Sequence, residues 1–169
     1  WPLEGICQRS VRHRKVLTMK RFMLLITMTA IALCCRAQTV DNATVPSLDL
    51  GRYLGRWYEL ARYDHSFEKG MQFATADYSI QSNGNVKVVN SGMKDGKMST
   101  SVGKAKLTET SGLLRVSFFG PFYSDYRVLM VSPDYSYALV GSKSENYLWI
   151  LSRTPKLTDD VLNQILEVA

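Results

Sequence analysis

Alternation of apolar and polar residues dominates the chain after residue 55. Short segments rich in Val, Tyr, Phe, Leu and Ile often repeat with a period of two, as in a strand with one buried face. Turn sequences such as Asn83-Gly84 and Asp95-Gly96 separate them. We therefore expect eight strands, over residues 56–63, 73–82, 85–93, 97–107, 113–119, 126–132, 135–142 and 146–153.

Eight short strands at even spacing favour an all-β sandwich or barrel. Because the predicted inner face carries few charges, the pattern suits a closed, antiparallel up-and-down β-barrel with a ligand cavity.

The last segment has helical spacing instead. Thr158 is a good N-cap, and Asp159 and Asp160 follow near the positive end of the expected helix. We expect its apolar face to pack on the barrel wall, through Val161, Leu162, Ile165, Leu166 and Val168. Because the sequence ends at Ala169 within this helix, we interpret the chain as truncated there.

The first 37 residues have the character of a leader rather than of a folded domain. Residues 19–37 predict a signal peptide, with two positive charges, a short apolar run and a cleavage site after Ala37. We interpret residues 1–18 as sequence upstream of the true start, with an N-terminal extension as the alternative. Lipid attachment at Cys34 or Cys35 is a second way to process the leader. Both routes export the protein, and residues 38–47 read as a linker.

Charge and cysteine content exclude several function classes. Seven of the 21 Lys and Arg residues and one of the 15 acidic residues lie in residues 1–37, which leaves 14 of each sign in the remainder. A nucleic-acid-binding protein needs a basic face, so we expect no nucleic-acid partner. All three cysteines lie in the leader, and His65 is the only histidine after it. We therefore expect no metal site, no cofactor and no cysteine nucleophile.

Two motifs identify a family. Gly55-Arg56-Trp57-Tyr58-Glu59 opens the first expected strand, and Leu148-Trp149-Ile150-Leu151-Ser152-Arg153-Thr154-Pro155 ends the eighth. This pair of motifs, at this separation, resembles the lipocalin family over residues 48–169. In detail the sequence is most similar to the bacterial outer-membrane lipocalins and to apolipoprotein D. The similar stretches include Ser117-Phe118-Phe119-Gly120-Pro121-Phe122-Tyr123.

The resemblance implies a structural role for three residues: Gly55 opens the motif, and Trp57 pairs with Arg153. An indole can plug one end of a barrel, and a stacked guanidinium adds about 0.5–2 kcal/mol. Two departures are visible. Ser132-Pro133-Asp134-Tyr135 only partly matches the family's Thr-Asp-Tyr motif, and the strand expected after the helix is missing.

Strand parity predicts which side chains face the interior. We expect a ligand-binding set from the first, second, fifth, sixth and eighth strands, with plain core packing as the alternative for each residue. The set is Glu59, Tyr78, Val116, Phe118, Tyr126, Val128, Met130, Tyr147, Trp149 and Leu151. The aromatic run 118–123 is interpreted either as a packed corner or as an exposed patch for membrane contact or dimerisation.

These features predict a binding protein rather than an enzyme. A fatty acid or lysophospholipid would occupy the barrel, for storage or transport in the maintenance of envelope lipids. The family resemblance places such a protein in the periplasm or outer membrane, with secretion as the alternative. A lipid-modifying enzyme on the same fold and a protein-interaction module using the open loops remain the alternative functions, and membrane association and a homodimer remain open.

Overall fold

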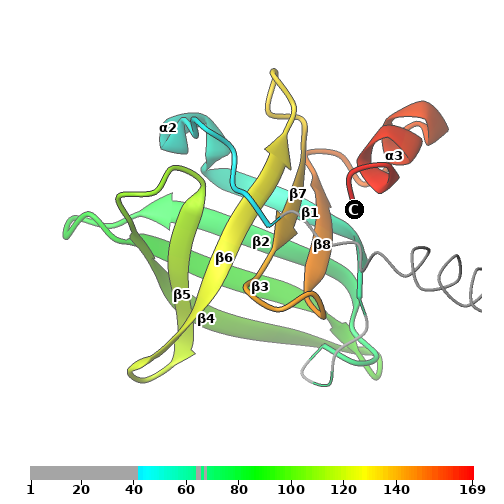
Figure 1. Cartoon of the computed structure of the whole chain (residues 1–169). Coiled ribbons are helices and arrows are strands. Elements are labelled where there is room, and N and C mark those ends of the chain that lie inside the picture. The colour runs from blue at the N-terminus through cyan, green and yellow to red at the C-terminus, as the bar shows by residue number, and fades with distance from the viewer. Residues whose placement is uncertain (1–41, 64–65, 67) are drawn as a thin grey trace, which may run out of the picture. The chain divides into compact units, whose positions relative to one another are not determined.

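The strands close into one barrel. The computed structural model describes residues 42–63, 66 and 68–169. Each strand pairs antiparallel with the next, and the last pairs with the first, which confirms the predicted eight-stranded up-and-down barrel (Figure 1). The strands are β1 (Gly55–Arg62), β2 (Gln72–Ile80), β3 (Val86–Lys94), β4 (Lys97–Leu107), β5 (Leu113–Phe119), β6 (Phe122–Val131), β7 (Tyr137–Gly141) and β8 (Leu148–Ser152).

Strand ends differ from the expected ranges where the turns are tighter or wider than the pattern indicated. β6 begins at Phe122 rather than at residue 126, because Phe119 pairs with Phe122 and the turn consists of Gly120 and Pro121. β7 begins at Tyr137 rather than at residue 135, because Tyr135 adopts a φ of 62°, which is incompatible with a strand. The strands of the β5–β6 hairpin are therefore paired up to the two-residue turn at its tip.

A β-bulge in β6 divides its side chains between two apolar clusters. The pairing register shifts between Val128 and Met130, so Val128 faces Val140 inside the barrel and Met130 faces Leu139 outside. A single extra residue reverses the alternation, because side chains in a strand have a period of two. Met130, which parity predicted to point inward, lies on the outer wall for this reason.

Helix α3 (Asp159–Leu166) covers that outer cluster. The hydroxyl of Thr158 accepts a hydrogen bond from the Val161 N–H at 3.4 Å, which caps the first turn as expected. Ile165 is fully buried against the cluster that contains Leu139. Two residues predicted to belong to the packed face are largely exposed instead: Leu166 is 54% exposed and Val168 is 57% exposed. Within the described ranges, no helix has the length and apolar content to cross a membrane.

The segment before β1 lies across one end of the barrel. The Val45 N–H donates to the Val128 carbonyl at 2.9 Å, so part of the expected linker 38–47 is hydrogen-bonded to β6. A short helix α2 (Leu50–Tyr53) follows, capped by the Asp49 carboxylate, which accepts from the Arg52 N–H at 3.2 Å. The sequence pattern did not predict this four-residue helix. It places Tyr53, 1% exposed, beneath the barrel interior.

Candidate functional site

One end of the barrel is closed by Trp57 and Arg153. Trp57 has no exposed surface, and the Arg153 guanidinium lies 3.8 Å from the centre of its ring. The guanidinium also donates to the carbonyl oxygens of Arg52 and Arg56 at 2.7 Å each, and to that of Leu54 at 2.8 Å. One side chain therefore covers the indole and satisfies the carbonyls at the end of α2 and the start of β1.

Gly55 fits this closure through its backbone. Its φ of 93° lies in the region that favours glycine, and a Cβ there would lie 3.4 Å from the Arg153 Nη1 atom. The Trp57 indole N–H donates to the Tyr53 carbonyl at 2.8 Å, so the plug leaves no indole donor unpaired. These contacts tie the first motif to the second.

The turn from β6 to β7 joins the same end. The Tyr135 hydroxyl accepts from the Asp49 N–H at 2.8 Å, and the Arg52 guanidinium lies 4.3 Å from the centre of the Tyr135 ring. Hydrogen bonds from the Ser132 and Ser136 hydroxyls and from the Ser136 N–H lower the pKa of Asp134 to about 2. The loosely matching Ser-Pro-Asp-Tyr segment thus forms a hydrogen-bonded turn against α2.

A cavity of about 460 Å³ occupies the barrel and opens at the opposite end. Seven of the ten predicted ligand-binding residues line it: Glu59, Tyr78, Val116, Phe118, Tyr126, Trp149 and Leu151. The other three predicted residues do not. Val128 is buried in the interior core, Met130 lies on the outer wall, and Tyr147 stacks on Trp149 with ring centres 6.1 Å apart.

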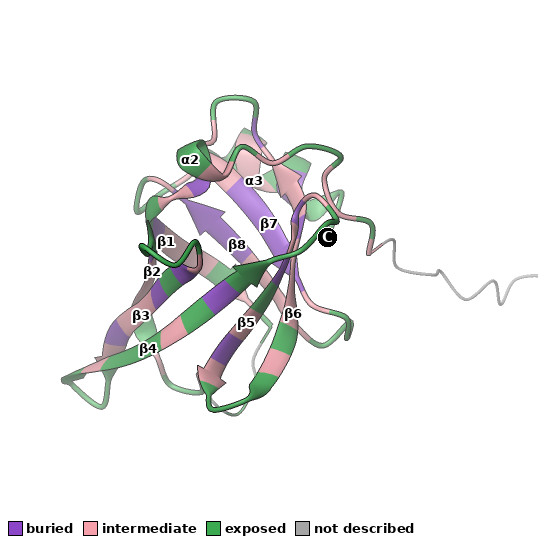
Figure 2. Ribbon diagram, turned by 90° about the vertical axis from the view of Figure 1, so that its left-hand side faces the viewer, coloured by how far each residue is buried: buried purple, intermediate pink, exposed green. Residues whose placement is uncertain are grey.

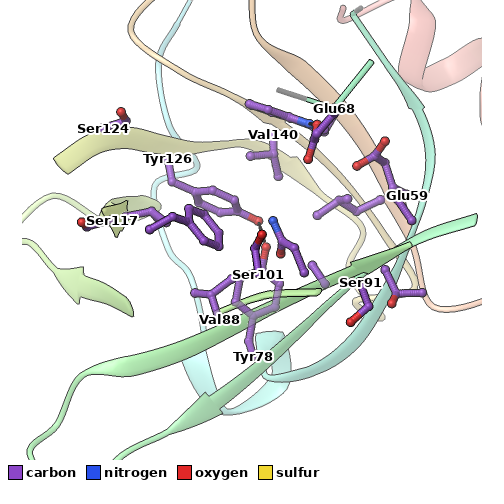
Figure 3. A pocket seen from close by; sticks show the side chains of 18 of the residues that line it. Glu59, Glu68, Tyr78, Val88, Ser91, Ser101, Ser117, Ser124, Tyr126 and Val140 are labelled. Atoms are coloured by element: carbon purple, nitrogen blue, oxygen red, sulfur yellow. Dashed lines mark hydrogen bonds between the residues drawn. The ribbon is translucent and has the colours of Figure 1, made fainter. Parts of the chain in front are cut away.

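Three tyrosines form a hydroxyl cluster at the inner end of the cavity. The Tyr126 hydroxyl is hydrogen-bonded to the hydroxyls of Tyr53 at 2.7 Å and of Tyr78 at 2.9 Å. Figure 3 shows Tyr126 reaching from β6 toward Tyr78 on β2. Burial is the main cause that raises the pKa of all three phenols, to about 12 for Tyr78. The cluster is therefore neutral and polar throughout the physiological pH range.

A group of charged side chains lies in the wall on the other side of the cavity. The Arg62 guanidinium donates to the Glu59 carboxylate and to the carbonyl oxygens of Glu68 and Met71, each carbonyl at 2.9 Å. The Glu68 carboxylate accepts from the Trp149 indole N–H at 3.2 Å. Glu59 and Glu68 line the cavity, and Figure 3 shows them on the side away from Tyr78. The Arg62 Nε atom also lies 4.0 Å from the Glu68 carboxylate, so among the described residues two carboxylates share one guanidinium in this wall.

Sequence reasoning missed the polar contribution of β3 and β4. Asn90, Ser91, Ser99 and Ser101 line the cavity. The Asn90 Oδ1 atom is buried and accepts no hydrogen bond from the residues that the structure describes. A Cβ at Gly103 would lie 2.8 Å from the Phe118 ring, so glycine makes room for that ring. The available signal was the run of small residues with period two at 99, 101, 103 and 105.

The chain matches a family model and many known proteins. The model of the lipocalin-like domain matches residues 48–169. The outer membrane lipoprotein Blc of Escherichia coli (strain K12) is 42% identical over 149 residues, covering 85% of this chain and 84% of that protein. Mouse (Mus musculus) apolipoprotein D is 32% identical over 163 residues, covering 86% of this chain and 85% of that protein.

A solved structure agrees in fold. The crystal structure of the cockroach allergen Per a 4 superposes with a TM-score of 0.62 and 22% identity, covering 75% of this chain and 82% of the allergen. At that identity the likeness concerns the barrel alone.

Proposed function

The chain belongs to the lipocalin-like family, and from that premise we propose that its barrel holds a single-chain lipid, with lysophospholipid preferred over fatty acid. Binding or transport of a small hydrophobic molecule is its general function. One observation carries the proposal: a cavity of about 460 Å³ that is plugged at one end and open at the other. That volume lies within the range of about 300–1,000 Å³ typical of small-molecule sites.

The lining supports an amphiphile. Apolar side chains such as Val88, Val140 and Leu151 provide a surface for an acyl tail, at about 0.8 kcal/mol per buried CH₂. The open end leaves a headgroup in contact with water. A ligand with one long tail and one polar end fits both conditions.

The polar groups favour lysophospholipid. The carboxylates of Glu59 and Glu68 share the single guanidinium of Arg62, and this excess of carboxylates would disfavour the carboxylate of a fatty acid. Ser91, Ser99 and Ser101 add hydroxyl groups to the cavity, and a lysophospholipid offers them a free glycerol hydroxyl as a donor whereas an ionised fatty acid offers none. The charge and the hydrogen-bonding capacity of the cavity therefore point to the same ligand class.

A binding role also accounts for the pairing of the cavity's polar groups. Glu59 pairs with Arg62, and Tyr126 pairs with Tyr53 and Tyr78. Lipocalins are generally binding proteins, and we propose the same here. Incubation with lysophospholipid followed by mass spectrometry tests this, because unchanged lipid is expected and a cleaved or transferred product would support catalysis.

The experiment on ligand class has two parts. Mass spectrometry should identify the lipid that copurifies from the host envelope. Titrations with a lysophosphatidylethanolamine and with palmitate, followed by tryptophan fluorescence, should give tighter binding of the former. The variant E68Q should narrow this difference, because it removes one carboxylate from the wall. Tighter binding of palmitate by the unmodified protein would contradict the proposed preference.

A matched pair of variants tests the site itself. Ala76→Phe adds a ring to a side chain that lines the cavity, whereas Val102→Phe adds one to an exposed position on β4. We expect the first variant to lose lipid binding and the second to retain it. Equal binding by both would place the ligand outside the barrel.

The envelope is the proposed site of action. The relatives that are 38–42% identical carry the name outer membrane lipoprotein, and this protein is likewise exported to the periplasm or outer membrane. We propose that it shuttles or stores single-chain lipids there. Cleavage after Ala37 and lipid attachment at Cys34 or Cys35 lie outside the described residues. N-terminal sequencing and mass spectrometry of the mature protein would distinguish them.

A further inference from the structure

Large apolar side chains are exposed at the strand ends around the cavity mouth. Phe73, at the start of β2, is 82% exposed, and Met98, in the β3–β4 hairpin, is 69% exposed. Phe119 and Phe122, at the tip of the β5–β6 hairpin, are each 79% exposed. We call these four residues the rim. The antiparallel order brings all of them to the end of the barrel opposite α2 (Figure 1).

Three phenylalanines are largely exposed to water at one end of the barrel, and a gathering of exposed apolar side chains usually marks an interaction site. Figure 2 shows exposed residues at the tips of the β3–β4 and β5–β6 hairpins, far from the buried stretches of β7 and β8. Phe73 also has a φ of 52°, unfavourable for a residue other than glycine. The chain therefore maintains an unfavourable backbone geometry where it presents this ring.

Basic side chains accompany the rim. Exposed lysines lie in or beside three of the four strand connections at this end, and the exposed carboxylates of the described residues there are those of Asp95 and Glu145. The lysines are Lys69, Lys94, Lys97 and Lys143. The chain from Gln38 onward has no formal net charge, whereas among the exposed described residues of this end four lysines stand against two carboxylates.

We propose that the open end docks on an anionic lipid bilayer, with the rim side chains in the interfacial layer and the lysines among the lipid headgroups. Separate apolar side chains flanked by lysines are suited to such binding, since each gains from partial burial and from attraction to anionic lipids. Long lysine stems can reach the headgroups while the rings lie deeper.

A bilayer fits this arrangement better than a second copy of the chain. Two copies meeting through their open ends would bring eight lysines against four carboxylates, counting the exposed side chains named above, whereas an anionic membrane complements the same charges. The rim also surrounds the mouth of the cavity, so docking would place the cavity against the source of its ligand. This last point rests on the proposed function, whereas the argument from the charge and exposure of the rim does not.

Vesicle flotation tests the proposal. The chain from Gln38 onward contains the whole barrel and α3, and it lacks the apolar leader that would bind vesicles by itself. We expect it to float with vesicles of equal parts phosphatidylcholine and phosphatidylglycerol, and more weakly with pure phosphatidylcholine. The double variant Phe73→Ser/Met98→Ser should bind vesicles about tenfold more weakly. These two residues do not line the cavity, so lysophospholipid binding should persist and report on the proposed function separately.

The matched control is Ile80→Ser/Leu107→Ser, which removes exposed apolar side chains (58% and 52%) from the closed end. It should float like the unmodified protein. If Phe73→Ser/Met98→Ser fails to fold by circular dichroism, Lys94→Gln/Lys97→Gln should reduce binding to anionic vesicles by about fivefold for each lysine. Equal flotation of rim and control variants would overturn the proposal. So would a lack of flotation combined with a dimer that the rim variant dissociates.

Discussion

The two ends of the barrel use the same kinds of side chain in different ways, since aromatic residues are buried at one end and exposed at the other. At the closed end, Trp57 and Tyr53 are buried, and Arg153 supplies both a stacking surface and hydrogen bonds to surrounding carbonyls. At the open end, Phe119 and Phe122 stand in water around a cavity. Aromatic residues contribute to stability at the first end and are available for contact at the second. We therefore expect stability and function to respond to mutations at opposite ends.

Trp57→Ala should have the largest effect on stability. The substitution removes the plug and leaves a void in a close-packed end, which typically costs about 3–5 kcal/mol. Urea unfolding followed by circular dichroism should show a lower midpoint with little change in slope. A loss below about 1 kcal/mol would mean that the closed end does not carry the stability assigned to it.

Alkaline pH should have the second-largest effect on stability, because it ionises the tyrosine cluster between the Trp57 plug and the cavity. Tyrosine ionises near pH 10 in the unfolded chain, whereas burial raises the pKa of Tyr78 to about 12. The folded protein then holds protons that the unfolded chain has lost. The contribution of Tyr78 to the free energy of unfolding is therefore fully present below pH 10. It is lost as the pH rises from 10 toward 12, which costs about 3 kcal/mol for this one residue.

Urea unfolding at a series of pH values, with phenolate absorbance recorded in parallel, measures this effect. Tyr126→Phe removes the central hydroxyl and one titrating group, so its stability should fall less steeply between pH 10 and 12. Normal ionisation near pH 10 without loss of the fold would argue against a buried cluster.

Arg153→Met should cost about 2 kcal/mol. The apolar replacement keeps some contact with the Trp57 indole but leaves carbonyl oxygens near the end of α2 without their donor, although water can reach part of that surface. Arg153→Lys is the matched control, because it keeps the charge and loses the planar fork. Stability close to that of the unmodified protein in the lysine variant would show that charge, rather than the guanidinium geometry, maintains the closure.

How well the sequence predicted which side chains face the barrel interior depended on the regularity of each strand. In β2 and β8 the period of two correctly indicated the interior side of Tyr78 and Trp149, because each keeps its alternation around that residue. In β6 it failed after Val128, since the bulge has no sequence signal that alternation alone detects. The exposure of Phe73 was not predicted either, because it depends on a backbone conformation that a pattern of apolar residues does not encode.

Phe119→Ser/Phe122→Ser should have the smallest effect on stability, within about 0.5 kcal/mol, because both rings are already mostly in water. Both residues also line the mouth of the cavity, so affinity for a single-chain lipid should fall by about three- to tenfold as apolar contact at the mouth is lost. Paired urea unfolding and lipid titration on the same preparation separate the two quantities. A large loss of stability with unchanged lipid binding would reverse the roles assigned to the two ends.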